Sequence, residues 1–482
     1  MKLANLTLVL SLLSPVHSWS LKEFISPIQE VLSVTQFDIP DSKILQFNKQ
    51  IDDFNNKRDI LIQEVEDSGI PYYTKYQDEI SIPLDSYSDN FVLRLSNWNQ
   101  TSSFLNEAIT ASRKLELKIW ETSVTHKFID IQVTQLEGTQ LLEHLTQKFN
   151  DTDFESNIII LDLPQAVFQT LPQSQNDLSL EDFTDSKEIF FKSYRDLESI
   201  YAWKLKALRL SVHSESKSDK IKTFVVTGGI HAREWISTST ACYILYQLLM
   251  DYEAGNHAAV RYLENLDFLF LPVMNPDGYA FTWKTERLWR KNRQETFNPR
   301  CDGIDIDHSF DFQFTSGSES PCSDDYAGEA AFEALEAYHW DNYLNETKHS
   351  HPIHAYIDLH SYAEEVLYPY AYSCDILPRD EENLLELAYG LSQSIRLKSG
   401  LYYEVIKACR DKGADLLPSM GAGSALDYMY HNKAYWAFVL KLRDAGTHGF
   451  LLPPKHIEPV GQEIYAAIKY FASFILYYDH YV

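Results

Sequence analysis

Between residues 90 and 172 the chain alternates short apolar strands with amphipathic helices. The period-two pattern of strands occurs in three segments: 90–96 (NFVLRLS), 127–133 (KFIDIQV) and 156–163 (SNIIILDL). Apolar residues at helical spacing occupy 102–123 and 136–150. This mixture over a short distance predicts a small α+β open sandwich, in which one sheet is backed by two helices. Residues 19–89 are polar without a clear period, and we interpret them as an extension with some helix.

The predicted elements become longer after residue 186. Buried strands are predicted at 222–229, 266–278 and 353–361, and a further strand starts at 436 and runs into a turn before 450. Amphipathic helices are predicted at 186–208, 239–253, 380–400 and 457–478. Buried strands that alternate with helices over about 300 residues predict a large α/β domain with a mixed or parallel sheet. Ligands of such sheets bind beyond the carboxyl ends of the strands, where the polar motifs of this chain fall.

The segment 170–186, rich in Ser, Asn, Asp and Gln, separates these two patterns and is the predicted linker. The first 20 residues carry one basic residue, an apolar run and small residues near Ser18, so we predict a signal peptide over 1–18. We therefore expect an N-terminal unit over 19–175, globular over about 90–172, and a second domain over 176–482. No later stretch is long and apolar enough for a membrane span.

Composition narrows the class of protein. The 482 residues are 45% hydrophobic and include 30 Tyr, 26 Phe and 9 Trp, which is enough for two large cores. Lys and Arg number 42 against 69 Asp and Glu, and the net charge of -27 argues against nucleic-acid or anionic-membrane binding. After the predicted signal peptide, three Asn-x-Ser/Thr sequons agree with the secretory route and are candidate glycosylation sites: Asn99, Asn150 and Asn345.

All five cysteines lie in the second half of the chain, so disulfides can cross-link only that half. Cys301 and Cys322 both flank turn-rich sequence and form the best candidate pair. A bond between Cys374 and Cys409 stays open as a second one. Cys242 lies inside the apolar run TACYILYQLLM, which favours a buried free thiol.

Two histidines and a glutamate form a candidate metal site. His231 and Glu234 follow the strand predicted at 222–229 and lie three residues apart, so their side chains share one side of a turn. His360 comes near the end of the strand predicted at 353–361, where a ligand would be presented at the sheet edge. Catalytic zinc sites commonly use two His and one Glu with an open fourth position. An H-x-x-E pair alone is common by chance, so the hypothesis depends on His360 reaching the same place.

Lys441 lies in the middle of the apolar strand WAFVLKL. A buried Lys needs a partner or loses its proton. The alternative is a strand-edge Lys whose ammonium reaches solvent.

Seven motifs resemble the zinc metallocarboxypeptidases of the pancreatic carboxypeptidase A type, which are made as secreted proenzymes. They are GGIHAREWIS, LPVMNPDGYAFTW, RLWRKNR, CDGIDID, SPCS, DLHSYAEEVLYPY and LRDAGTHGFLLP, in the family's order over roughly residues 180–482. The resemblance implies the carboxypeptidase fold, with a mixed sheet of the eight-stranded type flanked by helices. It makes the N-terminal unit the family's prosegment.

The resemblance also assigns roles to single residues. It makes His231, Glu234 and His360 the ligands of one Zn²⁺ and Asp305 the carboxylate that orients the first histidine. Residues at substrate-binding positions are Arg233, Arg290, Ser361, Tyr362 and Leu426, of which the two arginines match those that contact substrate and stabilise the oxyanion. Leu426 falls where an apolar residue lines the specificity pocket. Cys301 and Cys322 match a family disulfide.

Four positions depart from the family pattern. Lys441 occupies the place of the glutamate that accepts a proton from the zinc-bound water, and an ammonium cannot accept a proton. The Asn-Arg pair that holds the substrate's terminal carboxylate is Asp307 and His308 here, which lack the bidentate cation. No Tyr precedes SALD where the family has its mobile tyrosine. Because the charge changes cancel, we expect Lys441 to project into the cleft and to pair with Asp307.

We therefore expect a secreted or vacuolar zinc-binding pseudoenzyme without catalytic residues. It resembles the fungal inactive metallocarboxypeptidases linked to cell-wall organisation, and the resemblance implies a binding or regulatory role toward an unknown protein or peptide. The alternative is an active metallocarboxypeptidase of altered specificity. In that case Glu364 or Glu365 would be the base, and His308 or Lys441 would contact an acidic substrate.

Overall fold

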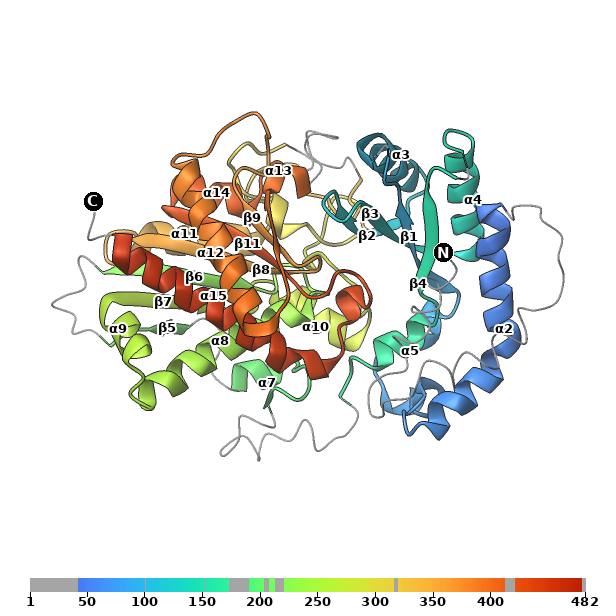
Figure 1. Ribbon diagram of the computed structural model, residues 1–482, viewed down its shortest axis with the longest axis horizontal. Helices are drawn as coiled ribbons and strands as arrows, with labels where there is room; N and C mark the ends of the chain where they lie inside the picture. Colours follow the sequence, from blue (N-terminus) through green and yellow to red (C-terminus); the bar gives the residue numbers. More distant parts are fainter. Residues whose placement is uncertain are drawn as a thin grey trace.

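The computed structural model describes residues 42–99, 101–150, 152–172, 190–202, 208–212, 221–315, 320–411 and 421–478. The predicted signal peptide, most of the predicted linker and the segment 412–420 lie outside these residues. Figure 1 shows two units side by side: a smaller one from the N-terminal part of the chain, in blue to teal, and a larger one from the rest. Among the described residues, no helix is long and apolar enough to cross a membrane.

The N-terminal unit is built around an antiparallel sheet with the described strand order β2-β3-β1-β4. Helices α3 and α4 pack on one face of the sheet, and α2 packs on α4. Its longer elements are α2 (Lys43–Asp67), β1 (Asn90–Ser96), α3 (Thr101–Lys114), β2 (Lys118–Ser123), β3 (Phe128–Thr134), α4 (Gln135–Thr146), β4 (Glu155–Ile160) and α5 (Leu163–Phe168). This is the small open sandwich that the sequence pattern predicted.

Two predicted helices are wrong in part. The helix predicted over 102–123 ends at Lys114, because Glu116 takes a left-handed φ of 56° and the chain then continues as strand β2. The helix predicted over 186–208 is short within the described residues. It is α7 (Leu197–Ala202), and Asp196 accepts a hydrogen bond from the backbone N–H of Ser199 at its start.

The larger unit has a mixed sheet whose described strands run in the order β10-β9-β11-β8-β6-β7-β5. These seven strands are one fewer than the family resemblance implied. Its longer elements, after α7, are β5 (Leu208–Leu210), β6 (Lys222–Gly228), α8 (Trp235–Glu253), α9 (His257–Asn265), β7 (Leu266–Leu271), α10 (Pro276–Lys284), α11 (Leu335–Thr347), β8 (Ile353–Ser361), β9 (Glu365–Tyr368), α12 (Glu381–Ser399), β10 (Glu404–Lys407), α13 (Ala408–Asp411), α14 (Ala425–Asn432), β11 (Trp436–Leu442) and α15 (Ile457–Tyr478).

Three neighbouring strands position the candidate site. Strands β11, β8 and β6 are adjacent and parallel, so their carboxyl ends meet at one edge of the sheet. Residues 231 and 234 follow β6, and Lys441 in β11 is the register partner of His360 in β8. Helix α15 packs against α8 and α12 and covers a face of the sheet (Figure 1).

The N-terminal sheet is buried on both faces. Phe91, Leu93 and Ile131 point to the core beneath α3 and α4. Val92, Trp120 and Phe128 instead belong to the hydrophobic core of the larger unit. One continuous core therefore joins the two units.

Candidate metal centre in an interdomain cleft

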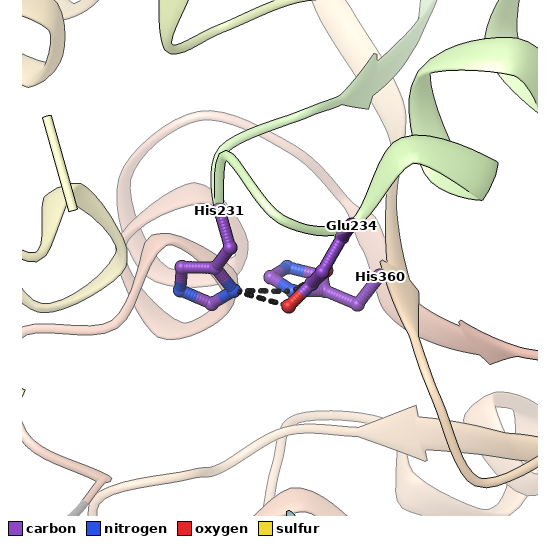
Figure 2. Close-up of side chains that lie close together, drawn as sticks. All are labelled: His231, Glu234 and His360. Atoms are coloured by element: carbon purple, nitrogen blue, oxygen red, sulfur yellow. Dashed lines mark hydrogen bonds and ion pairs between the residues drawn. The ribbon is translucent and has the colours of Figure 1, made fainter. Parts of the chain in front are cut away.

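The two histidines and the glutamate predicted as ligands meet at the carboxyl edge of the sheet. His231 and Glu234 lie on the turn between β6 and α8, and His360 reaches them from β8 (Figure 2). Nδ1 of His231 lies 2.7 Å from Oε1 of Glu234, and both histidines are almost fully buried. The ligand atoms of all three residues lie within 4.8 Å of one another.

The arrangement fits a tetrahedral zinc ion. Bonds of about 2.0–2.1 Å in a tetrahedron place neighbouring ligand atoms about 3.3 Å apart. Nδ1 of His360 lies 3.2 Å from Nδ1 of His231 and 3.3 Å from Oε2 of Glu234. One carboxylate and two imidazoles are also the donor set that zinc prefers, so these residues can hold the ion.

A buried carboxylate lies beside each imidazole. Oδ1 of Asp305 lies 3.2 Å from Nε2 of His231, and Arg290 donates to the other oxygen of Asp305 at 2.8 Å. Oδ2 of Asp358 lies 3.2 Å from Nε2 of His360. Each ring therefore turns Nδ1 toward the cluster and Nε2 toward a carboxylate, the arrangement by which outer carboxylates fix metal-binding histidines.

Electrostatics at this edge of the sheet favour a cation. Burial would lower the pKa of His360, but Asp358 and Glu234 raise it to about 10. Burial would raise the pKa of Glu234, and the two histidines reverse this and hold it well below the usual value. The carboxylates that stabilise a protonated imidazole stabilise a divalent cation at the same place.

A cavity of about 460 Å³ lies above the cluster, between the two units. The larger unit supplies His231, Glu234, His360 and most of the predicted site residues around it: Arg233, Arg290, His308, Ser361 and Lys441. The N-terminal unit supplies part of the opposite side through β2, from Lys118 to Thr122. The cleft above the candidate metal centre is thus covered by a strand of the N-terminal unit.

Lys441 borders this cavity as predicted, but its predicted partner is wrong. Its Nζ donates to Oδ1 of Asp411 at 2.5 Å and to Oε1 of Glu121 in β2 at 2.9 Å. Burial would lower the pKa of Lys441, and Asp411 and Glu121 raise it above its usual value. The ammonium stays charged because it is bound by carboxylates from both units, and it does not pair with Asp307.

Asp307 and His308 lie in a short 3₁₀ turn, Ile306–His308, and both are buried. Oδ1 of Asp307 accepts a hydrogen bond from the backbone N–H of Ala425 at 3.2 Å. Nδ1 of His308 lies 3.0 Å from the carbonyl oxygen of Ala422. Both side chains are thus held by backbone groups around the start of α14.

The remaining predicted site residues have protein partners. Arg233 pairs with Asp324 at 3.0 Å, and Tyr362 donates to Asp130 of the N-terminal unit at 2.6 Å. The backbone N–H of Ser361 donates to Glu234 at 3.0 Å. Leu426 is buried in α14 and is not among the residues that line the described cavity.

Both candidate disulfides are present, Cys301–Cys322 and Cys374–Cys409, and Cys242 is a buried free thiol as predicted. The three sequon asparagines, Asn99, Asn150 and Asn345, are exposed.

Four residues of the site were missed by sequence reasoning: Asp358, Asp324, Glu121 and Asp411. A signal for Asp358 existed, because residues i and i+2 of a strand share one face and Asp358 precedes His360 by two. Glu121 lay in a segment interpreted as helix, and 320 residues separate it from Lys441. No local pattern connects them.

Residues 198–467 match the family model described as zinc carboxypeptidase. This chain belongs to the zinc carboxypeptidase family. It is 48% identical over 418 residues to inactive metallocarboxypeptidase ECM14 of Saccharomyces cerevisiae, a match that covers 81% of this chain and 93% of that protein. A protein of the same name from Ajellomyces dermatitidis is 36% identical over 437 residues, with 81% and 72% covered.

Solved structures agree with the carboxypeptidase fold. Thrombin activatable fibrinolysis inhibitor superposes with a TM-score of 0.66 at 23% identity, covering 80% of this chain and 99% of that one. Carboxypeptidase A from Helicoverpa armigera gives a TM-score of 0.67 at 20% identity, with 80% and 97% covered. The names of the two fungal relatives agree with the departure at Lys441. The prediction of an inactive zinc carboxypeptidase homologue agrees with the names of these relatives.

Replacing Asp305 with Asn is expected to weaken zinc binding by about 10–100-fold, because the carboxylate that fixes the His231 ring would be lost. The dissociation constant can be measured by competition with a chromogenic chelator. Asp302→Asn is the matched control, since Asp302 pairs with Arg293 at the surface, and it should leave zinc affinity unchanged. Equal affinities of the Asp305→Asn protein and the parent would contradict the orienting role.

Proposed function

We propose that this protein is a zinc-binding pseudoenzyme of the secretory pathway. Its carboxypeptidase fold holds one Zn²⁺ but does not hydrolyse peptides, and it serves a binding or regulatory role. The proposal rests on one observation. A lysine occupies the position of the family's catalytic base, and this lysine is buried and ion-paired to two carboxylates. The resemblance to fungal inactive metallocarboxypeptidases extends the proposal to cell-wall organisation.

His231, Glu234 and His360 are the residues that would hold the ion. A zinc ion bound there would polarise a carbonyl group and acidify a bound water. Peptide hydrolysis also needs a group that accepts the proton of that water and passes it to the leaving amine. Lys441 cannot accept a proton, because Asp411 and Glu121 keep it protonated.

The alternative of an active peptidase lacks a usable base. Glu365 is fully buried in β9 and accepts hydrogen bonds from Ser123 and Thr125 of the N-terminal unit. Burial, with Glu463 and Asp444 nearby, raises the pKa of Glu364 to about 7. Neither glutamate borders the described cavity above the metal cluster.

A second loss concerns the substrate's terminal carboxylate. Asp307 would repel this group, and His308 offers no bidentate cation in place of an arginine. Lys441 is no substitute, since its ammonium is already bound on two sides. A peptide that entered the cleft would not be positioned over the metal.

Three features support the secretory route. The N-terminal sequence has the pattern of a signal peptide, three exposed asparagines lie in glycosylation sequons, and two disulfides join cysteines of the larger unit. The ligand of the proposed function is a protein or peptide of unknown identity. Extracellular space and vacuole are the proposed locations.

Protein purified from its native host without chelators should contain about one zinc per chain and hydrolyse no peptide. Metal analysis measures the first, and assays with apolar, basic and acidic C-terminal substrates measure the second, before and after cleavage within residues 173–189. A zinc carboxypeptidase with an intact base serves as the positive control. Metal-free protein would contradict the zinc site, and zinc-dependent turnover would contradict the pseudoenzyme.

A further inference from the structure

We infer that the N-terminal unit, residues 42–172, is the lasting occupant of the cleft and that Lys441 is its anchor. The two units then stay together as a noncovalent pair when the chain is cut between them. The inference rests on the proposed function in one respect, because a cleft that turns over no substrate need not open.

The first contact is an ionic cluster formed by four elements. Lys441 of β11 lies between Glu121 of β2 and Asp411 of α13 at 2.9 and 2.5 Å. The side chains of Lys441 and Glu121 are each 10% exposed, and that of Asp411 is 1% exposed. Glu365 of β9 faces the same ammonium. One cation of the larger unit is therefore bound directly by a carboxylate of the N-terminal unit.

Hydroxyl groups of the N-terminal unit complete this cluster. Ser123 and Thr125 donate to Oε1 of Glu365 at 3.1 and 2.9 Å. Nε2 of His126 lies 3.1 Å from the carbonyl oxygen of Ala363. Among the described residues, the hydrogen-bond donors to this buried carboxylate thus come from the end of β2 and the turn after it.

A second buried cluster lies beside the first. Asp130 of β3 is fully buried and accepts hydrogen bonds from Tyr362 of the larger unit and from Arg94 of β1. Arg94 also donates to the carbonyl oxygen of Ala445 at 3.1 Å. Gly446 has a φ of 96°, and a Cβ there would lie 1.6 Å from a guanidinium nitrogen of Arg94. Glycine at this position lets the arginine approach the larger unit.

Apolar contacts surround the polar ones. Trp120 of β2 packs against Phe450 with ring centroids 5.4 Å apart, and Tyr362 contacts the same ring at 5.0 Å. These rings belong to the hydrophobic core that both units share. Separation would expose this core and would remove the carboxylate of Glu121 from Lys441. Both effects favour retention of the pair.

The interface contains a matched control for the anchor. Lys118 of β2 pairs with Glu286 of the larger unit at 2.5 Å, but these side chains are 44% and 28% exposed. The two ion pairs join the same strand to the same unit and differ in burial. Exposed pairs contribute little, whereas truncation of one partner of a buried pair is costly.

The test uses the full chain with a specific protease site placed within residues 173–189 and cut after purification. Sedimentation of the cut protein over a dilution series at pH 8, where the Glu121 carboxylate is ionised, gives the dissociation constant of the pair. Lys441→Met should raise it by about 30-fold or more. Glu121→Met, which leaves the larger unit unchanged, should have an effect of similar size. Lys118→Met should raise it by less than about 5-fold.

Circular dichroism of each uncut variant shows whether it is folded. If the Lys441→Met protein does not fold, the dissociation constant of the Glu121→Met protein decides the test. Separation of the parent pair after cutting, or equal effects of Lys118→Met and Glu121→Met, would overturn the inference. Peptide assays on any separated larger unit distinguish the two proposals. Separation without hydrolysis overturns only the inference, whereas hydrolysis overturns the proposed function.

Discussion

Replacement of Lys441 with glutamate is expected to lower the free energy of unfolding by about 3–5 kcal/mol at pH 7.5 and to give no peptidase activity. The introduced carboxylate would face Glu121 and Asp411, which now bind the ammonium, as well as Glu365. Like charges in a buried site raise one another's pKa values above those of the unfolded chain. The contribution of these carboxylates to stability should therefore be largest in acid and fall as the pH rises, so the loss caused by the substitution should be smaller at pH 5 than at pH 7.5. Denaturant unfolding at both pH values measures this.

The matched comparison is the triple variant Lys441→Glu, Asp307→Asn and His308→Arg. It restores the amide and the bidentate cation for the substrate's terminal carboxylate, which would position a peptide over the metal. After cleavage within residues 173–189, any hydrolysis should come from the triple variant and none from Lys441→Glu alone, at equal zinc content. Full activity of the single variant would show that Asp307 and His308 still hold the terminal carboxylate.

His360→Ala is expected to abolish stoichiometric zinc binding and to lower thermal stability at the same time. The imidazole lies 3.2 Å from His231 and 3.3 Å from Glu234, so its loss removes one of three ligands. Binding at a thousand times the dissociation constant stabilises the folded state by about 4 kcal/mol, and this contribution would disappear. Metal analysis and thermal unfolding with and without added zinc measure both effects.

His354→Ala is the control on the same strand, because His354 stacks on Tyr435 at 5.5 Å and lies outside the metal cluster. This variant should keep its zinc and its zinc-dependent rise in melting temperature. A His360→Ala protein that retained one zinc per chain would place the metal elsewhere.

The large elements of the fold could be predicted because each one carries its own period. The strand over 353–361 and the helix over 457–478 match β8 and α15 as predicted. Strand β2 could not be predicted from the sequence, because its apolar positions follow those of α3 closely enough to extend the helical pattern. The interruption is a single left-handed residue, Glu116, and the pairing that makes the segment a strand comes from β3.

Some features of the candidate site could likewise be predicted from the sequence, and others could not. His231, Glu234 and His360 could be predicted to meet because each lies at or after the carboxyl end of a strand, and those ends converge. Lys441 could be predicted to reach the cleft because it occupies the position of the family's catalytic glutamate. Its pairing with Asp307 was inferred from a balance of charges, which does not specify distance. Its actual partners lie on another unit and on α13.

The cluster around Lys441 holds three carboxylates against one ammonium, so the interface takes up protons as it forms. Burial, more than the opposing effect of Lys441, raises the pKa of Glu121 to about 7, and burial beside Asp411 raises the pKa of Glu365 well above its usual value. In a separated N-terminal unit Glu121 would be solvated and would titrate near its ordinary value of about 4.3. Association is therefore strongest in acid and weakens as the pH rises through 7. The two units would bind each other more tightly in an acidic compartment than in a neutral one.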